Sequence, residues 1–202
     1  MAGNDLLERV APLLQSLGVT DDAARAALLG RLSAREFAHG DMVLRAGEFS
    51  DTLYLLESGL MRLYYTTPDG RERNKAFYAG GEITGPVSAA MTGSAAPFSI
   101  QCLEDTRALA FAFADLEQAS RDHPALARYY TRMLARAFIR NEQREAMLLT
   151  CNAEQRYRWL LQHERELARR LPQFHIASYL GIEAVSLSRL KRKLKRAPGA
   201  VP

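Results

Sequence analysis

Residues 172–194 read Pro172-Gln-Phe-His-Ile-Ala-Ser-Tyr-Leu-Gly-Ile-Glu-Ala-Val-Ser-Leu-Ser-Arg-Leu-Lys-Arg-Lys-Leu194, and they decide the fold of the C-terminal part. Apolar Ile176, Ala177 and Leu180 suit one face of a short helix. Gly181 suits a tight turn after that helix, because glycine readily adopts the left-handed conformation that such a turn requires. A second amphipathic helix follows, so the stretch predicts a helix-turn-helix.

The second helix of this pattern spans about residues 184–195. Its inward positions are Leu190, Leu194 and either Val185 or Leu187. In a helix-turn-helix the second helix enters the major groove, where serine and arginine near its start reach base edges or phosphates and later lysines lie near the backbone. The DNA-binding candidates are therefore Gln173, Ser186, Ser188, Arg189, Lys191, Arg192 and Lys193. The alternative is a helical hairpin with a solvated face.

Charge is distributed unevenly along the chain. The 202 residues contain 27 Lys/Arg and 23 Asp/Glu, a formal net charge of +4. Residues 152–202 alone hold 11 basic and 4 acidic residues, so their charge is +7, and residues 1–151 carry −3. A local basic cluster favours a polyphosphate partner, although such a cluster taken alone is often only a solvated tail.

Several classes of protein are disfavoured by the sequence. We expect no membrane helix, because no apolar run has the required length, and no secretory signal, because the N-terminal residues lack a basic region followed by an apolar one. Cys102 and Cys151 lie far apart, which favours reduced cytoplasmic thiols over a disulfide framework or a zinc site. Only His39 of the four histidines lies in the strand-rich region, and no catalytic motif occurs. We predict neither an enzyme nor a resident cofactor or metal.

The region from residue 36 to residue 113 alternates short apolar runs with turns. The runs that predict strands are Met42–Arg45, Thr52–Leu56, Leu60–Tyr65, Ala76–Tyr78, Phe98–Cys102 and Arg107–Phe111. Pro68-Asp69-Gly70 predicts a hairpin turn, because proline presets φ and glycine supplies a positive φ. Short strands at this spacing are typical of a sandwich or small barrel. Before them, residues 5–32 predict helix, with Thr20 as an N-cap and Asp21 in the first turn.

A long helix is predicted from Pro124 to Leu149, after a short helix or turn over residues 113–122. The long helix is apolar over two faces, so one face has the β-rich domain to cover and the other favours a second subunit. The candidate interface residues are Leu126, Tyr130, Met133, Ala137, Asn141 and Leu148. An ordinary helix packed within one chain is the alternative. A capping box at Asn152-Ala-Glu-Gln155 restarts the helix after a hinge at residues 150–152.

The whole chain resembles the Crp/Fnr family of bacterial transcription regulators. The resemblance lies in residues 39–48, 53–59, 80–83 and 176–191, in this order. It implies an α+β fold: a double-stranded β-helix (jelly-roll) sensor domain of the cyclic-nucleotide-binding type at 1–123, a dimerisation helix at 124–150 and a winged helix-turn-helix domain at 151–202.

Two positions depart from that family. Its cyclic-nucleotide binders pair a glycine-glutamate with an arginine-serine, and here Gly81-Glu82 is present while the arginine position lies in Pro97-Phe98-Ser99. No Arg or Lys occurs from residue 82 to residue 106, so an enclosed phosphate would lack a cation. We expect no usual response to cyclic AMP, with Glu82 as a turn residue or, alternatively, a ribose ligand. The candidate pocket is Gly81, Glu82, Ile83, Phe98 and Ser99.

In the recognition helix, Ala184 and Val185 replace the arginine and glutamate of better-known members, while Arg189 matches. The cysteine cluster of oxygen-sensing members is missing, so we expect no iron–sulfur cluster. The sequence thus predicts a cytoplasmic, homodimeric, sequence-specific DNA-binding transcription regulator. Its expected partners are a pseudo-palindromic DNA operator and RNA polymerase, with an unknown effector or none. The alternative is a cyclic-nucleotide- or small-metabolite-sensing module that acts through a protein partner.

Overall fold

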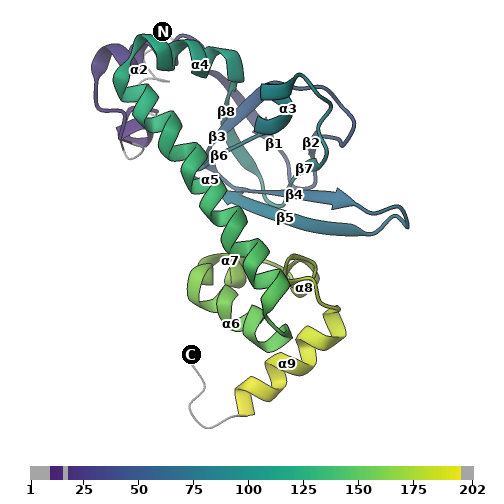
Figure 1. The fold of residues 1–202 in the computed structure, drawn as a ribbon. Coiled ribbons are helices and arrows are strands. Elements are labelled where there is room, and N and C mark those ends of the chain that lie inside the picture. Colours follow the sequence, from purple (N-terminus) through teal and green to yellow (C-terminus); the bar gives the residue numbers. More distant parts are fainter. Residues whose placement is uncertain (1–9, 16–17, 197–202) are drawn as a thin grey trace. The chain divides into compact units, whose positions relative to one another are not determined.

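The computed structural model describes residues 10–15 and 18–196. The elements in chain order are α2 (Asp22–Leu29), β1 (Ser33–Phe37), β2 (Met42–Leu44), β3 (Thr52–Ser58), β4 (Leu60–Thr66), β5 (Glu72–Ala79), β6 (Ile83–Thr84), α3 (Val87–Thr92), β7 (Ser99–Cys102), β8 (Thr106–Ala112), α4 (Phe113–Asp122), α5 (Pro124–Thr150), α6 (Ala153–His163), α7 (Arg165–Arg170), α8 (Gln173–Leu180) and α9 (Ala184–Arg196). Figure 1 shows this order from purple to yellow.

The chain divides into two compact units. Unit 1 comprises residues 1–65 and 77–137, and unit 2 comprises residues 66–76 and 138–202. The sequence predicted boundaries at residues 123 and 150 instead. The long helix α5 therefore contributes its first half to unit 1 and its second half to unit 2, and the tip of the β4–β5 hairpin belongs to unit 2.

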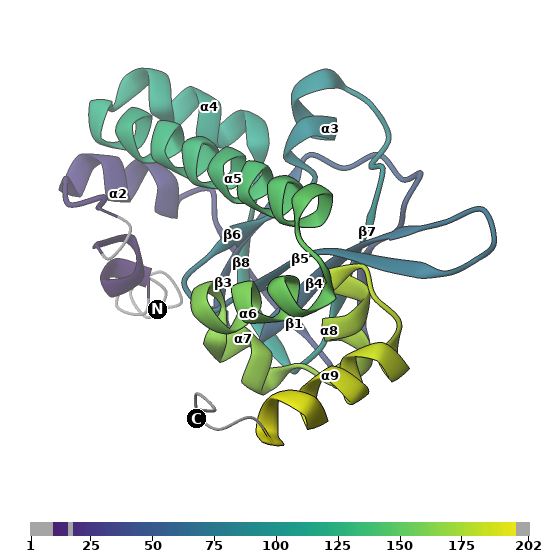
Figure 2. The ribbon, with the colours of Figure 1, turned by 60° about the horizontal axis from the view of Figure 1, so that its bottom comes forward.

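Unit 1 is built on strands in two antiparallel four-stranded sheets, ordered β1-β8-β3-β6 and β2-β7-β4-β5. The sheets are separate layers and do not form a closed barrel. Alternate residues of these strands face inward, and the core that they form with the helices includes Leu53, Leu109, Leu116 and Leu126. Helices α2 and α4 and the first half of α5 lie together at one side of the sheets (Figure 2).

The predicted strands and the two helices at 113–122 and 124–150 are confirmed. Strands β1 and β6 were not predicted, since β6 has two residues and β1 exposes its three middle residues. The helix start at Thr20 was wrong by one residue. Asp21 is the N-cap and accepts a hydrogen bond from the Ala24 amide at 2.7 Å. Residues 5–9 and 16–17 of the predicted N-terminal helical region lie outside the described residues.

Unit 2 gathers α6 to α9 with the second half of α5 (Figure 2). The predicted capping box is confirmed: Asn152 accepts from the Gln155 amide, and Gln155 returns a bond to the Asn152 amide. Residues 151–196 form helices and turns without a strand, so the wing that the resemblance implies is not found in this range. Residues 197–202 lie outside the described residues.

Candidate nucleic-acid interface

Helix α8 is the buried helix of the pair. Five of its eight residues are buried, among them the three predicted inward residues Ile176, Ala177 and Leu180. Tyr179 is 2% exposed and donates its hydroxyl to the Glu164 carboxylate at 3.0 Å. Burial raises the pKa of Tyr179, so this hydroxyl stays protonated and keeps its role as the donor. The first helix of the motif is thus held rigidly by its own domain.

The turn between α8 and α9 has the predicted glycine geometry. Gly181 ends α8 with φ 64°, in the left-handed region, and the Ile182 amide donates to the Ala177 carbonyl at 3.0 Å. A Cβ on Gly181 would lie 3.2 Å from the Arg156 guanidinium and 3.4 Å from Leu148. The left-handed conformation therefore favours glycine here, and a Cβ would also require the Arg156 guanidinium to shift slightly.

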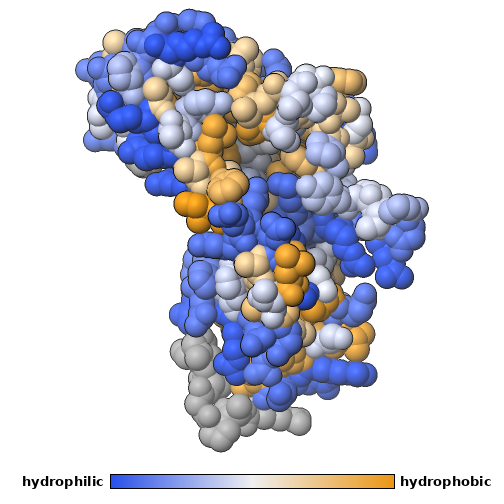
Figure 3. Space-filling model, in the orientation of Figure 1, coloured by the Kyte–Doolittle hydropathy of each residue, from blue (hydrophilic) through white to orange (hydrophobic). Residues whose placement is uncertain are grey.

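Helix α9 presents most of its residues to solvent. The predicted recognition helix at about 184–195 is found as Ala184–Arg196. Leu187 is 0% exposed while Val185 is 61% exposed, which settles the inward position in favour of Leu187. Ser186, Arg189, Arg192 and Lys193 are exposed as well. Hydrophilic residues cover most of the visible surface over α9, with a few apolar residues among them (Figure 3).

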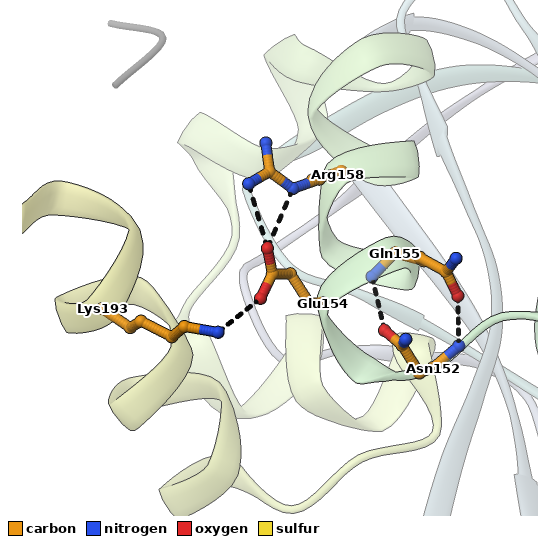
Figure 4. A network of polar contacts seen from close by, with 5 residues as sticks. All are labelled: Asn152, Glu154, Gln155, Arg158 and Lys193. Atoms are coloured by element: carbon orange, nitrogen blue, oxygen red, sulfur yellow. Dashed lines mark hydrogen bonds and ion pairs between the residues drawn. The ribbon is translucent and has the colours of Figure 1, made fainter. Parts of the chain in front are cut away.

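One of the predicted DNA-binding cations has a partner inside the protein. Lys193 Nζ lies 3.0 Å from Glu154 Oε2, and Arg158 pairs with the other oxygen of the same carboxylate at 3.0 Å (Figure 4). The hydrogen bonds from Lys193 and Arg158 lower the pKa of Glu154, and the bond from Lys193 has the larger effect. The carboxylate is therefore ionised at neutral pH and neutralises part of the charge of α9.

The remaining predicted candidates are distributed over both helices. Gln173 is the exposed first residue of α8, and Ser188 and Lys191 are half-buried on α9. The structure places all seven candidates on the two helices of the motif. Sequence patterns do not distinguish Lys193 from Arg192, because the partner of Lys193 is 39 residues away along the chain.

Two arginines of unit 2 act as internal hydrogen-bond donors. Arg156 donates to the carbonyls of Leu148, Cys151 and Leu180 at 2.7, 2.8 and 3.0 Å. Arg144 donates to the carbonyl of Tyr179 at 3.0 Å. These guanidinium groups satisfy carbonyls at the ends of α5 and α8, where the helices themselves leave acceptors unpaired.

The tip of the β4–β5 hairpin is fastened to α8. Asn74 is 2% exposed, and its side-chain amide lies 3.2 Å from His175 Nδ1 and 3.0 Å from the His175 carbonyl. The backbone amide of Asn74 donates to Ser178 Oγ at 2.9 Å, and the Ser178 hydroxyl donates to the Glu72 carbonyl. Sequence patterns missed this contact, since residues 74 and 175 are remote in the chain.

The candidate ligand pocket of unit 1 is engaged in contacts of its own. Glu82 is exposed and its carboxylate accepts the Ala79 amide at 2.7 Å, which caps the turn at Gly81. Ser99 is buried, and its hydroxyl accepts the Ala46 amide at 3.0 Å. The buried Phe98 ring packs edge-on against Tyr65. Glu82 therefore makes the contacts of a turn residue, which is one of its two predicted roles.

The candidate dimer-interface residues of α5 do not form a single exposed surface. Leu126 is 0% exposed in the core of unit 1, and Tyr130 and Met133 pack against that core. Leu126 therefore offers no surface to a partner and is removed from the interface. The exposed apolar residues of α5 are instead Phe138, Ile139 and Leu149, at 63%, 50% and 77%. Apolar residues gather over the middle of α5 in Figure 3.

Comparison with known proteins agrees with these features. The family model of the cyclic nucleotide-binding domain matches residues 34–123. The fumarate and nitrate reduction regulatory protein of Vibrio cholerae is 25% identical over 169 residues, which are 78% of this chain and 67% of that protein. The transcriptional activator Anr of Pseudomonas protegens is 25% identical over 168 residues, 77% of this chain and 68% of that protein. The chain is a Crp/Fnr relative.

Solved structures share the fold of this Crp/Fnr relative. FixK2 of Bradyrhizobium japonicum has a TM-score of 0.70 at 23% identity, over 81% of this chain and 84% of that chain. The regulator CLP of Xanthomonas campestris has a TM-score of 0.71 at 18% identity, over 89% and 97%. The relatives are named as regulators, in agreement with the prediction that the chain is not an enzyme.

Neither a membrane-spanning helix nor a metal-binding cluster is found in the described part of this chain. Within residues 10–15 and 18–196, no helix is both long enough and apolar enough to span a membrane. In the same described part of the chain, His, Cys, Asp and Glu residues form no group of three that would hold a metal ion.

Proposed function

We propose that this chain is a sequence-specific, DNA-binding transcription regulator that works as a homodimer in the bacterial cytoplasm. The observation that carries the proposal is the exposed basic face of α9, which follows a left-handed glycine turn on the buried helix α8. This is the arrangement in which a recognition helix enters the major groove. The names of its relatives, which are regulators of transcription, support the same function.

DNA binding is tested by fluorescence anisotropy with a duplex selected from a random pool, at several salt concentrations. We expect affinity to fall as salt rises, because cations on α9 displace counterions from phosphates. Arg189→Ala is expected to weaken binding to the selected duplex by about 1–3 kcal/mol if Arg189 reads a base. Arg169→Ala, which alters an exposed cation on α7 that has no contact with the Glu154–Lys193 pair, is the control. Binding that is absent or independent of salt would contradict the proposed function.

The second subunit is proposed to cover the exposed apolar face of α5. This face comprises Phe138, Ile139 and Leu149. Phe138 and Leu149 lie three turns apart, so both face the same side of α5, as pairing with a second helix requires. Two recognition helices then meet successive major grooves, about 34 Å apart, on a pseudo-palindromic site.

The dimer is tested by sedimentation at micromolar concentration. We expect a dimer for the natural chain and a monomer for Phe138→Glu, because a charge in an apolar interface lacks compensation. Phe49→Glu alters a residue of unit 1 that is 76% exposed and serves as the matched control. A monomeric natural chain would rule out this part of the proposal.

Regulation is proposed to act through the orientation of the two α9 helices. An effector of unit 1 shifts that orientation only through its different affinities for the two states. In the absence of an effector, abundance of the protein controls binding. RNA polymerase is the proposed partner in activation.

A further inference from the structure

One residue of α9 does not fit a purely basic surface. Val185 lies in the first turn of the helix, and 61% of it is exposed. The apolar residues Leu187, Leu190 and Leu194 of the same helix are buried or half-buried. The fold of unit 2 therefore leaves Val185 outside, with its methyl groups available to whatever α9 contacts.

The neighbours of Val185 indicate what kind of surface it meets. Ser186 follows it directly, and Arg189 lies one turn further along the same side of the helix, where both residues are exposed. Arg192 is exposed about one turn beyond Arg189. An aliphatic side chain at the start of a row of cations suits a partner with phosphates opposite the cations and an apolar group opposite Val185.

We propose that Val185 contacts the 5-methyl group of a thymine in the major groove and so specifies a thymine at one position of each half-site. The inference rests on the proposed function. Among the four bases only thymine presents an apolar group in the major groove, while the others present hydrogen-bond donors and acceptors alone. Valine neither donates nor accepts a hydrogen bond, so it leaves the polar edges of guanine, adenine and cytosine without a partner.

The position in the helix favours Val185 over its neighbours for this role. Residues at the start of a recognition helix contact base edges, while later residues lie nearer the backbone. Ala184 is exposed as well, but its single methyl group has a shorter reach. Leu187 is fully buried and is not available.

The experiment removes single methyl groups from the DNA. A duplex that the full chain selects from a random pool is resynthesised with each thymine replaced, one at a time, by deoxyuridine, which lacks only the 5-methyl group. We expect one thymine per half-site at which affinity falls about fourfold, the fold-change for one buried methyl group. With both half-sites replaced, the expected loss is roughly fifteenfold.

The variant Val185→Ala assigns that effect to the side chain. It is expected to bind the thymine and deoxyuridine duplexes equally well at the identified position, and circular dichroism checks that it is folded. Val185→Thr retains one methyl group and should retain part of the discrimination. Lys191→Ala is the matched control, because it should weaken both duplexes by the same factor.

The outcomes separate two kinds of failure. A chain that binds its selected duplex with no deoxyuridine effect, or with the same effect in Val185→Ala, overturns the thymine contact while leaving DNA binding in place. A chain that selects no sequence and shows no salt-dependent binding overturns both proposals. Binding of an acidic protein by the Val185 surface, with DNA unaffected by Val185→Ala, also contradicts the thymine contact.

Discussion

The turn and strand at Gly81 to Ser99 and the helix α9 both carry polar residues that the sequence marks as candidates for binding, but the fold treats them differently. In the first region, Glu82 and Ser99 each accept a backbone amide, and Phe98 is packed in the core. In the second, Arg189 and Arg192 extend into solvent from a helix that is anchored by Leu187. A polar group engaged by its own chain contributes to the fold, and an exposed one is available to a partner.

The largest expected effect is that of Arg156→Ala, because Arg156 is a cation that the fold itself uses. Its loss leaves three carbonyls without their charged donor, and a hydrogen bond to a charged group typically contributes about 1.5–3 kcal/mol. We expect the free energy of unfolding to fall by about 3 kcal/mol, measured by urea denaturation.

The control for Arg156 is Arg158→Ala, two residues away on the same helix. Arg158 forms one exposed ion pair with Glu154, so its loss should change the free energy of unfolding by about 0.5 kcal/mol or less. Equal effects of the two variants would show that the buried hydrogen bonds of Arg156 stabilise unit 2 no more than the exposed ion pair of Arg158.

Asn74→Ala comes next, because it removes a buried amide from the hairpin–α8 contact. The buried His175 ring and carbonyl then lose their contacts with the Asn74 side-chain amide, and loss of a buried hydrogen-bond partner typically costs about 1–3 kcal/mol. We expect a decrease of about 2 kcal/mol in the free energy of unfolding. Arg71→Ala, on the exposed turn of the same hairpin, should have little effect, since its partner Asp69 is exposed as well. A stable Asn74→Ala would mean that the hairpin contributes little to unit 2.

Glu154→Gln tests whether the ion pair with Glu154 limits the contribution of Lys193 to DNA binding. Removing the carboxylate leaves Lys193 and Arg158 without their ion-pair partner, so α9 gains positive potential. We expect DNA affinity to rise by about two- to fivefold, the range for a surface ion pair. Glu166→Gln, which breaks the exposed pair with Arg169 on α7, is the control. A fall in affinity would indicate that Glu154 positions Lys193 for DNA.

The smallest expected effect concerns the first region. Titration calorimetry with cyclic AMP and cyclic GMP should detect no tight binding, because no Arg or Lys lies between residues 82 and 106 to compensate the phosphate. A site of micromolar affinity would reverse the comparison and make the Gly81–Ser99 region a working ligand site.

Local patterns predicted the elements well, because each depends on residues close together in the chain. Gly181 needs only its own backbone conformation to form the turn, and Asn152 and Gln155 form a capping box three residues apart. The long helix from Pro124 to Thr150 contains no internal glycine or proline. The exceptions were the helix start at Thr20, a choice between adjacent capping residues, and the wing, which was taken from resemblance and is not found in residues 151–196.

The candidate site was predicted less completely. The sequence placed the seven DNA-binding candidates on two helices, yet it left Val185 and Leu187 as equal choices for the inward position. It assigned Leu126 to a dimer interface, because periodicity shows that a helix has an apolar face without showing what covers it. The contact of Asn74 with His175 gave no sequence signal at all.

The sequence by itself determined the order of elements, the helix-turn-helix and the net charge of +7 on residues 152–202. These features depend on composition and on residue spacing within a few helical turns. Only the tertiary structure decided which side chains remain exposed for a partner. Lys193 meets Glu154, Arg156 meets three carbonyls and Glu82 caps its own turn, while Val185 and Arg189 stay exposed. The physical reason is that burial and hydrogen bonding are settled between residues far apart in the chain, which no local pattern records.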